Sequence, residues 1–300
     1  MTKIVIIGSS ISGYTVAMNL RRLIADSSIT IVSQSQDSFY DRRRLLDLIS
    51  GTIKEKEIFF ADEASLKDNS IGLEKPHKIA AVSCSRKQLY YKEKGGIEYD
   101  FLVIASGAKP VLPEIPGIKK EGVFSFYSLD DVRAISKLLI EDHVCVVGSD
   151  EFSLGLAKAI SDKYKAEVKL LSNKVFDSAL LTDKIEVIDS QPLEIIGEGQ
   201  VQAVKLETGK IIAASAVVFC GNSKPAADFL RGTPVDLQDG FVQVDNSMCT
   251  SVREIFACGA VAAINDIPQV SIDWDECINQ AGIVSENLAK IIKAQICQTC

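Results

Sequence analysis

Histidine is scarce in this sequence: His77 and His143 are the only two among 300 residues. There is also no serine-hydrolase motif, and no set of histidines and cysteines has the spacing of a zinc site. These absences argue against hydrolysis by an activated serine and against a bound metal. If the chain is an enzyme, the chemistry has to come from an organic cofactor.

Long runs of one kind of residue are missing as well. No apolar run approaches the ~20 residues that cross a bilayer, and no segment resembles a signal peptide. The net charge of −7 is spread along the chain without a long basic run. We therefore expect no membrane span, no nucleic-acid partner and a cytoplasmic location.

The composition is that of a large globular protein. Apolar residues make up 47% of the chain and charged residues 24%, which is enough for one large or two medium domains. Most of the eight cysteines stand in apolar surroundings, where cysteine acts as a small hydrophobic residue. A disulfide framework is not expected at this length.

The opening stretch predicts a strand, a glycine turn and a helix. Ile4 to Ile7 form a short apolar run, and an amphipathic segment from Tyr14 to about Ile24 follows the turn from Gly8 to Gly13. The turn has the spacing of the dinucleotide fingerprint G-x-G-x-x-G, with Ser10 in the middle position. Gly8 permits the turn, Gly13 allows close packing of the helix, and the free amides at the helix start can bind a pyrophosphate.

The second strand, from Ser28 to Ser33, departs from the usual dinucleotide pattern at its end. An acidic residue ~20 positions after the last glycine normally binds the ribose, and here that position is Ser33. Either neutral groups bind the ribose, or no adenosine binds. Arg42, Arg43 and Arg44 follow and lead into a helical segment. Arginines in such a run either form a solvated surface or bind phosphate. For Arg42 we give the two roles equal weight.

Four blocks in order carry a resemblance to a known family: G-x-S-x-x-G from Gly8, Tyr40-Asp-Arg42, Phe101-Leu-Val-Ile-Ala-Ser-Gly107 and Thr250-Ser-Val-Arg-Glu-Ile-Phe-Ala-Cys-Gly259. Together they resemble the FAD-dependent pyridine nucleotide-disulfide oxidoreductases, and especially the NADH:rubredoxin and ferredoxin reductases. The resemblance covers essentially the whole chain. It implies an α/β fold with two Rossmann-like domains, the second inserted in the first.

The resemblance implies FAD binding in the first domain, at the positions Gly8, Ser10, Gly13, Ser33, Arg42, Gly107, Gly259 and Ala260. Ala260 stands where the family has the aspartate that holds the flavin's ribityl chain. Asp273, Asp275 and Glu276 open the last helix, where they either disfavour reduced flavin or simply cap the helix.

The second domain repeats the strand, turn and helix from His143, and the resemblance implies that this repeat binds NAD(P)H. Only Gly148 remains in register, because Asp150 and Ser153 occupy the other two glycine positions. A carboxylate at the helix start satisfies the amides itself and repels a pyrophosphate. We expect a fold that has lost the ordinary nicotinamide site. The alternative is a degenerate site that still works.

The last residues of the sequence include a lone C-x-x-C formed by Cys297 and Cys300. It is either a mobile redox dithiol or a helix end with two incidental thiols. We expect no further C-terminal interface domain of the kind that the rubredoxin-type reductases have.

The predicted domains are 1–112 with 238–300, of the FAD type, and 113–237, of a degenerate NAD(P) type. The predicted function is a flavoprotein oxidoreductase or electron-transfer component with a redox partner protein. The alternative is a scaffold or regulatory subunit without nucleotide.

Overall fold

The computed structural model describes residues 1–138, 143–177, 183–269 and 273–299. The described residues divide into two compact units. The first comprises Met1–Asp41, Phe59–Lys109 and the segment from Lys224 onward, and the second comprises Arg42–Ile58 and Pro110–Ser223. This division differs from the predicted boundaries in that Arg42–Ile58 joins the second unit and the return to the first unit follows Ser223. The assignment of a nucleotide to each unit stays a prediction.

The first unit is built on a parallel sheet with the strand order β20-β7-β1-β2-β3. Its strands are β1 (Lys3–Ile7), β2 (Ser28–Val32), β3 (Ile71–Glu74), β7 (Phe101–Ile104) and β20 (Ile255–Ala257). Every neighbouring pair is parallel. All residues of β7 are buried, which is typical of a parallel strand covered on both faces.

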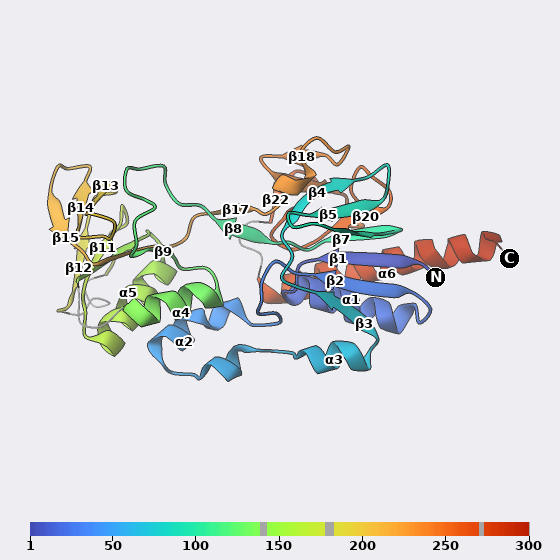
Figure 1. The fold of residues 1–300 in the computed structure, drawn as a ribbon, viewed down its shortest axis with the longest axis horizontal. Helices are drawn as coiled ribbons and strands as arrows, with labels where there is room; N and C mark the ends of the chain where they lie inside the picture. The colour runs from blue at the N-terminus through green and yellow to red at the C-terminus, as the bar shows by residue number, and fades with distance from the viewer. Residues whose placement is uncertain (139–142, 178–182, 270–272, 300) are drawn as a thin grey trace. The chain divides into compact units, whose positions relative to one another are not determined.

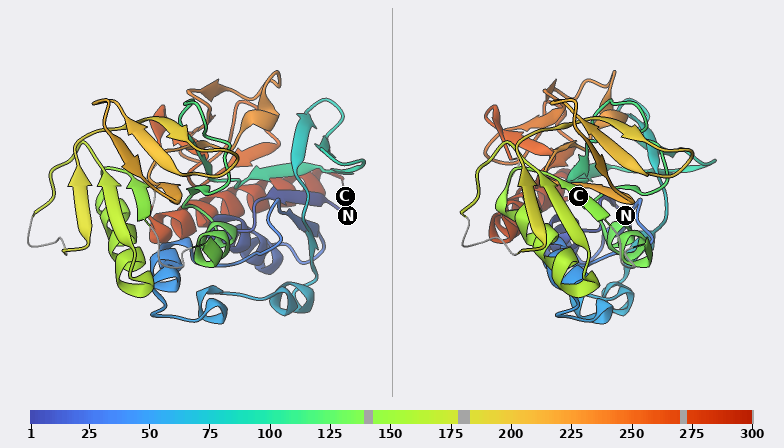
Figure 2. Two further views of the ribbon diagram at one scale, coloured as in Figure 1. Left: turned by 60° about the vertical axis from the view of Figure 1, so that its left-hand side comes forward. Right: turned by 90° about the vertical axis from the view of Figure 1, so that its left-hand side faces the viewer.

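Helix α1 (Ile11–Leu23) starts earlier than predicted, because the turn after β1 spans only Gly8 to Ser10. Ser10 is the extended N-cap residue, and Gly13 is already helical and buried. The long helix α6 (Trp274–Thr299) packs along α1 (Figure 1, Figure 2). The short helix α3 (Glu63–Asp68) precedes β3.

Smaller sheets complete the first unit. One is the antiparallel sheet of β4 (Ile79–Ser83), β5 (Gln88–Tyr91) and β6 (Gly96–Glu98). A further sheet has the order β18-β19-β21-β22, made of β18 (Leu237–Gln238), β19 (Phe241–Val244), β21 (Ala262–Ile264) and β22 (Ile267–Pro268). Two further short strands, β8 (Ala108–Pro110) and β17 (Ser223–Pro225), pair with each other, and each of them includes residues of both units.

The second unit repeats the plan of the first with a parallel sheet in the order β12-β11-β10-β16-β9. Its strands are β9 (Val123–Ser125), β10 (His143–Val147), β11 (Glu167–Leu171), β12 (Ile185–Ile188) and β16 (Ala216–Phe219). Helix α5 (Glu151–Tyr164) follows β10 as α1 follows β1. An antiparallel sheet adds β13 (Pro192–Ile196), β14 (Ala203–Leu206) and β15 (Ile211–Ala213). The predicted α/β fold with two Rossmann-like halves is confirmed.

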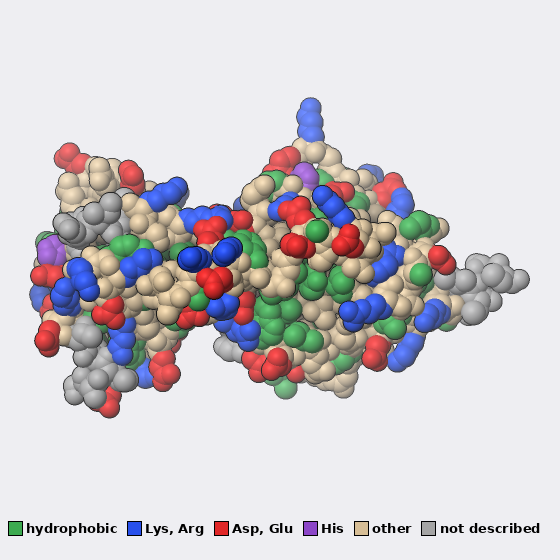
Figure 3. Space-filling model, turned by 90° about the horizontal axis from the view of Figure 1, so that it is seen from below, with side chains coloured by type: hydrophobic (Ala, Val, Ile, Leu, Met, Phe, Trp, Pro, Cys, Tyr) green, Lys and Arg blue, Asp and Glu red, His purple; other side chains and the backbone are tan. Residues whose placement is uncertain are grey.

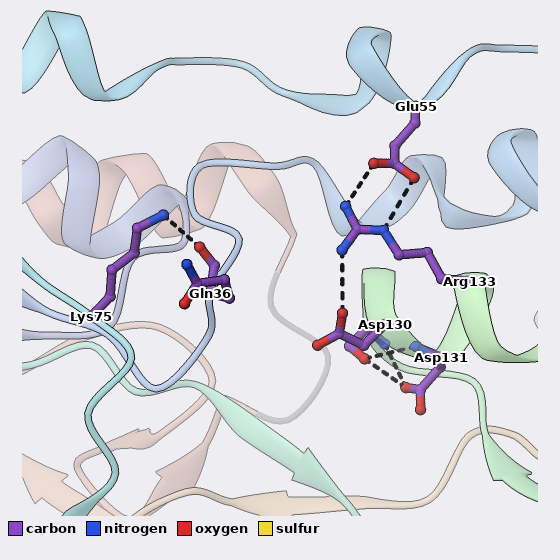
Figure 4. Close-up of polar contacts among 7 residues, drawn as sticks. Gln36, Glu55, Lys75, Asp130, Asp131 and Arg133 are labelled. Atoms are coloured by element: carbon purple, nitrogen blue, oxygen red, sulfur yellow. Dashed lines mark hydrogen bonds and ion pairs between the residues drawn. The ribbon is translucent and has the colours of Figure 1, made fainter.

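Polar contacts fix the remaining helices of the second unit, α2 (Leu45–Ser50) and α4 (Leu129–Leu138). Ser128 Oγ accepts the Asp131 N–H at 3.2 Å, and Asp131 Oδ2 accepts the Ser128 N–H at 2.8 Å, so the two residues cap the start of α4. Arg133 makes two hydrogen bonds to Glu55, of 2.6 and 3.1 Å (Figure 4). Glu55 opens the 3₁₀ turn Glu55–Ile58, so this pair ties the turn to α4.

Charged side chains of both signs are interspersed on the face shown in Figure 3. Among the described helices, none combines the length and the apolar character needed to cross a lipid bilayer.

Candidate functional site

The turn after β1 requires glycine at both of its outer positions. Gly8 has a φ of +114°, and a Cβ there would lie 2.2 Å from the carbonyl oxygen of Ala105. A Cβ on Gly13 would lie 2.0 Å from the carbonyl oxygen of Gly8. The helix therefore starts in close contact with the turn and with the end of the neighbouring strand β7.

The start of α1 has neither a side-chain cap nor an acidic residue. Ser10 is the N-cap residue but its side chain makes no capping hydrogen bond, and the first turn contains no acidic residue. A helix start without an internal cap leaves amide donors and the positive end of the dipole available. Gly107, two residues beyond Phe101–Ala105, has a φ of +66° and no atom within 4 Å of its Cβ position.

The ribose position after β2 is occupied by a hydroxyl pair. Ser33 Oγ lies 2.7 Å from Ser9 Oγ, and both residues are buried. The Ser33 N–H donates to the carbonyl oxygen of Glu74 at 2.9 Å. The acid of the usual dinucleotide pattern is absent here, as the sequence indicated, and the two hydroxyls that stand in its place already have partners.

Gly259 and Ala260 reach the same edge of the sheet from β20. The Gly259 N–H donates to Gln280 Oε1 at 2.8 Å in a buried contact. A Cβ on Gly259 would lie 2.8 Å from Ser12 Oγ, so this turn touches the start of α1. The sequence did not single out Gln280. Its only signal was its place on the first turns of the last helix.

One of the acidic residues at the start of α6, Asp273, caps the helix. Asp273 Oδ1 accepts the Glu276 N–H at 2.7 Å. Glu276 Oε1 in turn accepts a hydrogen bond of 3.2 Å from Gln280 Nε2. The Trp274 ring packs edge-on against Phe60, with centroids 5.2 Å apart. Capping, one of the two roles considered for these residues, is the one observed for Asp273.

The structure thus brings together most of the predicted first-site residues at the carboxyl ends of β1, β2, β7 and β20: Gly8, Ser10, Gly13, Ser33, Gly107, Gly259 and Ala260. Arg42 belongs to the second unit instead. Its guanidinium carbon lies 3.4 Å from the centroid of the Tyr127 ring, and its Nε donates to the Tyr127 carbonyl at 3.2 Å. A role for Arg42 at the first turn stays a prediction.

The helix start after β10 is capped by side chains, whereas the helix start after β1 is not. Asp150 Oδ1 accepts the Ser153 N–H at 2.7 Å, and Ser153 Oγ accepts the Asp150 N–H at 3.1 Å. The two residues that replace glycines therefore form a capping box. The second oxygen, Oδ2, faces Gly221: a Cβ on that glycine would lie 3.2 Å away. The carboxylate stands at the helix start where an anion would otherwise bind.

A cavity of about 730 Å³ opens at this turn, and all of its lining residues belong to the second unit. Asn173, which the sequence analysis missed, accepts hydrogen bonds from Ser149 and Gln191 on the cavity wall. Asn173 follows the end of β11 by two residues, a position from which it could have been predicted as a site residue. No feature of the sequence indicated Gln191. The lining comprises Arg42, Leu45, Pro110, Val111, Leu112, Ser125, Phe126, Tyr127, Val147, Gly148, Ser149, Asp150, Phe152, Asn173, Gln191, Phe219, Cys220, Gly221, Asn222 and Ser223.

Two further predictions concern thiols and metals. Cys300 lies outside the described residues, and the side chain of Cys297 is not described either, so the proposed dithiol stays a prediction. Within the described part of the chain, no group of three or more histidine, cysteine, aspartate or glutamate side chains is arranged to hold a metal ion.

Two parallel sheets, each with a strand, a turn and a helix at its centre, are the architecture of two dinucleotide-binding-type domains. The family model of the pyridine nucleotide-disulphide oxidoreductases matches residues 2–281. The chain therefore belongs to this family, and the resemblance seen in the sequence is confirmed.

Individual relatives agree with this assignment. The chain is similar to an NADH oxidase of Methanocaldococcus jannaschii, with 25% identity across 96% of this chain and 70% of the relative. It is also similar to the NADH-rubredoxin oxidoreductase of Clostridium acetobutylicum, with 26% identity across 87% of this chain and 68% of the relative. The solved complex of putidaredoxin reductase with putidaredoxin matches the fold with a TM-score of 0.86 and 19% identity, across 96% of this chain and 75% of that one.

Proposed function

We propose that this chain is a flavoprotein that binds FAD in its first unit and transfers electrons to or from a protein partner. The uncapped start of α1 beside Gly8 and Gly13 carries this proposal, because it offers amide donors to a pyrophosphate. Membership of the pyridine nucleotide-disulphide oxidoreductases supports it.

The residues of the first unit are compatible with the cofactor at its phosphates. Gly8, Ser10 and Gly13 would hold the pyrophosphate, and the open side of Gly107 leaves room for a ligand next to the backbone. Ser33 and Ala260 offer no carboxylate to the sugar hydroxyls, so we expect weaker binding than in relatives that keep both acids. Bound FAD would supply reversible electron transfer.

We further propose that the nicotinamide nucleotide site of the second unit is weakened or lost. A diphosphate at the start of α5 would lie close to the Asp150 carboxylate, and its amide donor on Ser153 is already taken. Two like charges ~4 Å apart cost about 4 kcal/mol at an effective dielectric near 20. Solvent screens part of this cost because Asp150 is exposed, and a dissociation constant for NADH in the millimolar range remains our expectation.

The electron-transfer partner is proposed by analogy with named relatives. One relative is called an NADH-rubredoxin oxidoreductase, and one solved structure contains putidaredoxin reductase with putidaredoxin. If NADH binds poorly, electrons have to enter through another donor, and a small redox protein is the simplest one.

The second candidate function is a scaffold or regulatory subunit that holds no nucleotide. Two contacts in the first unit favour it. Gln280 already accepts the Gly259 N–H at 2.8 Å, and Ser9 already pairs with Ser33. Both groups are thereby satisfied without a ligand.

Absorbance spectroscopy separates the two candidates. The purified chain, or the chain incubated with excess FAD at low salt and then desalted, is expected to show the absorbance of oxidised flavin near ~450 nm. A colourless protein after reconstitution would refute the flavoprotein and leave the scaffold. Stopped-flow mixing with micromolar NADH is expected to give little reduction, and reduction at rates typical of reductases would refute the weakened nicotinamide site.

A further inference from the structure

The second unit contains two adjoining cavities, although its helix start is capped internally. The cavity of about 730 Å³ at Gly148 adjoins a smaller one of about 320 Å³. Asn173 and Gln191 line both. The larger cavity has an apolar wall, to which Leu45, Phe126 and Phe152 contribute. A space of this size can hold a drug-sized organic molecule.

The charges that line the two cavities are mainly negative. Asp150 lines the larger cavity, and Asp189 and Glu207 line the smaller one. Arg42 is the only cationic side chain among the lining residues, and its guanidinium is stacked on Tyr127. The lining therefore carries a net charge of −2. Concave surfaces concentrate the potential of the charges that line them, so this one attracts cations.

Two acceptor groups on these walls still lack a donor. Asp150 uses Oδ1 for its helix cap, whereas Oδ2 accepts no hydrogen bond from the described residues. Ser190, which lines the smaller cavity, is only 8% exposed, and its hydroxyl has no partner among the described residues. A ligand with N–H donors would satisfy Asp150 Oδ2, because a carboxylate can only accept hydrogen bonds.

We propose that these adjoining cavities bind an organic cation, namely an amine with an apolar or aromatic body. The ammonium group would pair with the carboxylates, and the body would cover the apolar wall. This inference rests on the part of the proposed function in which the second unit no longer binds a dinucleotide. Asp150, which stands at a position of the glycine fingerprint, then has two effects. It disfavours a bound anion, and it makes the remaining cavity prefer a cation.

Calorimetric titration of the full chain with three matched probes tests the charge preference. Tryptamine, tryptophol and indole-3-acetate share one ring system and differ in charge, which is positive, neutral and negative respectively. We expect tryptamine to bind at least about tenfold more tightly than indole-3-acetate, with tryptophol between them. Equal or tighter binding of indole-3-acetate would overturn the inference, and so would failure of tryptamine to bind.

Charge-removing variants locate the binding site. Asp150→Asn keeps a good N-cap residue and removes the charge, so the fold is retained. We expect it to weaken tryptamine about fivefold and to leave tryptophol unchanged. Asp162→Asn is the matched control, because Asp162 is exposed near the other end of α5 and lines neither cavity. If Asp150→Asn, Asp189→Asn and Glu207→Gln all bind tryptamine like the control, the inference is wrong.

A parallel titration with NADH separates this inference from the proposed function. Micromolar binding of NADH that tryptamine does not displace would overturn both the weakened nicotinamide site and the cation site. Weak NADH binding together with no tryptamine binding would overturn the cation site alone. The flavin absorbance near ~450 nm reports on the first unit separately.

Discussion

The two strand–turn–helix starts of this chain have the same backbone plan and opposite chemistry. Ser10 at α1 leaves its helix start uncapped, whereas Asp150 at α5 forms a capping box with Ser153. The first helix has no acid in its first turn, and the second adds Glu151. In one domain the amides remain available to a ligand, and in the other they are used internally. We therefore expect the two turns to differ in their preference for anions, although both keep the strand, turn and helix arrangement.

The largest effect on stability and on FAD binding is expected from adding a side-chain atom at Gly13, where the helix touches the turn. Gly13→Ala would place a Cβ 2.0 Å from the Gly8 carbonyl, so we expect a loss of unfolding free energy of about 3 kcal/mol or more and loss of FAD binding. Gly282→Ala in α6 is the control, since nothing lies within 4 Å of its Cβ position. The control is expected to gain about 0.5 kcal/mol from helix propensity. Urea denaturation and flavin absorbance measure both, and an unaffected Gly13→Ala protein would contradict the close contact.

Converting the second turn to the chemistry of the first is the next test. Asp150→Gly with Ser153→Gly removes the carboxylate and the capping box, and is expected to tighten NADH binding on the order of tenfold. Fluorescence titration with NADH measures the change. Unchanged affinity would mean that other parts of the cavity, and not the charge of Asp150, limit nucleotide binding.

Restoring an acid to the first site should sharpen the contrast further. Ala260→Asp places a carboxylate where the resemblance implies contact with the flavin's ribityl chain, and a charged hydrogen bond contributes about 1.5–3 kcal/mol. We expect FAD to bind about tenfold more tightly and ADP, which has no ribityl chain, to bind as before. An equal gain for both ligands would show a general effect and contradict the assigned position.

The two caps should differ in their contribution to stability. Asp150→Ala removes a capping hydrogen bond of 2.7 Å and is expected to lower the free energy of unfolding by about 1 kcal/mol. Ser10→Ala removes a side chain that makes no capping bond, and the change is expected to stay within about 0.5 kcal/mol. Chemical denaturation of both variants tests this difference, and equal losses would contradict it.

Cysteines beside the two turns give the smallest expected effect. Burial raises the pKa of Cys277, which a hydrogen bond with Ser12 partly offsets. Burial, and then the Asp150 charge, raises the pKa of Cys220. Both thiols are therefore protonated at pH 7, and alkylation by iodoacetamide should rise about tenfold per pH unit up to pH 9.

Cys277 is half-buried and should react faster than buried Cys220. Peptide mapping by mass spectrometry can follow each thiol. FAD should slow the labelling of Cys277 alone, and protection of Cys220 instead would argue against a flavin at the first turn.

Local sequence patterns determined much of this protein. The apolar run Ile4–Ile7 specifies a buried strand, and Gly8 specifies its turn. Apolar side chains favour burial, and the positive φ at position 8 favours glycine. Asp150 and Ser153 were identifiable as residues that close a helix start, since capping depends on neighbours only three positions apart. Patterns of this range predicted the two strand, turn and helix segments, and the resemblance carried by four motifs in order implied the two Rossmann-like halves.

Contacts between distant residues were decided only by the tertiary structure. Gln280 reaches Gly259 across 21 positions, and Gln191 reaches Asn173 across 18. Arg42 joined the second unit because its guanidinium stacks on Tyr127, 85 positions away. Side chains of this kind have several partners available to them, and only the packing of strands and helices brings one of those partners within reach. The sequence therefore determined which side chains stand at the two helix starts, and the folded chain decided which distant residues and which cavity lie beside the second one.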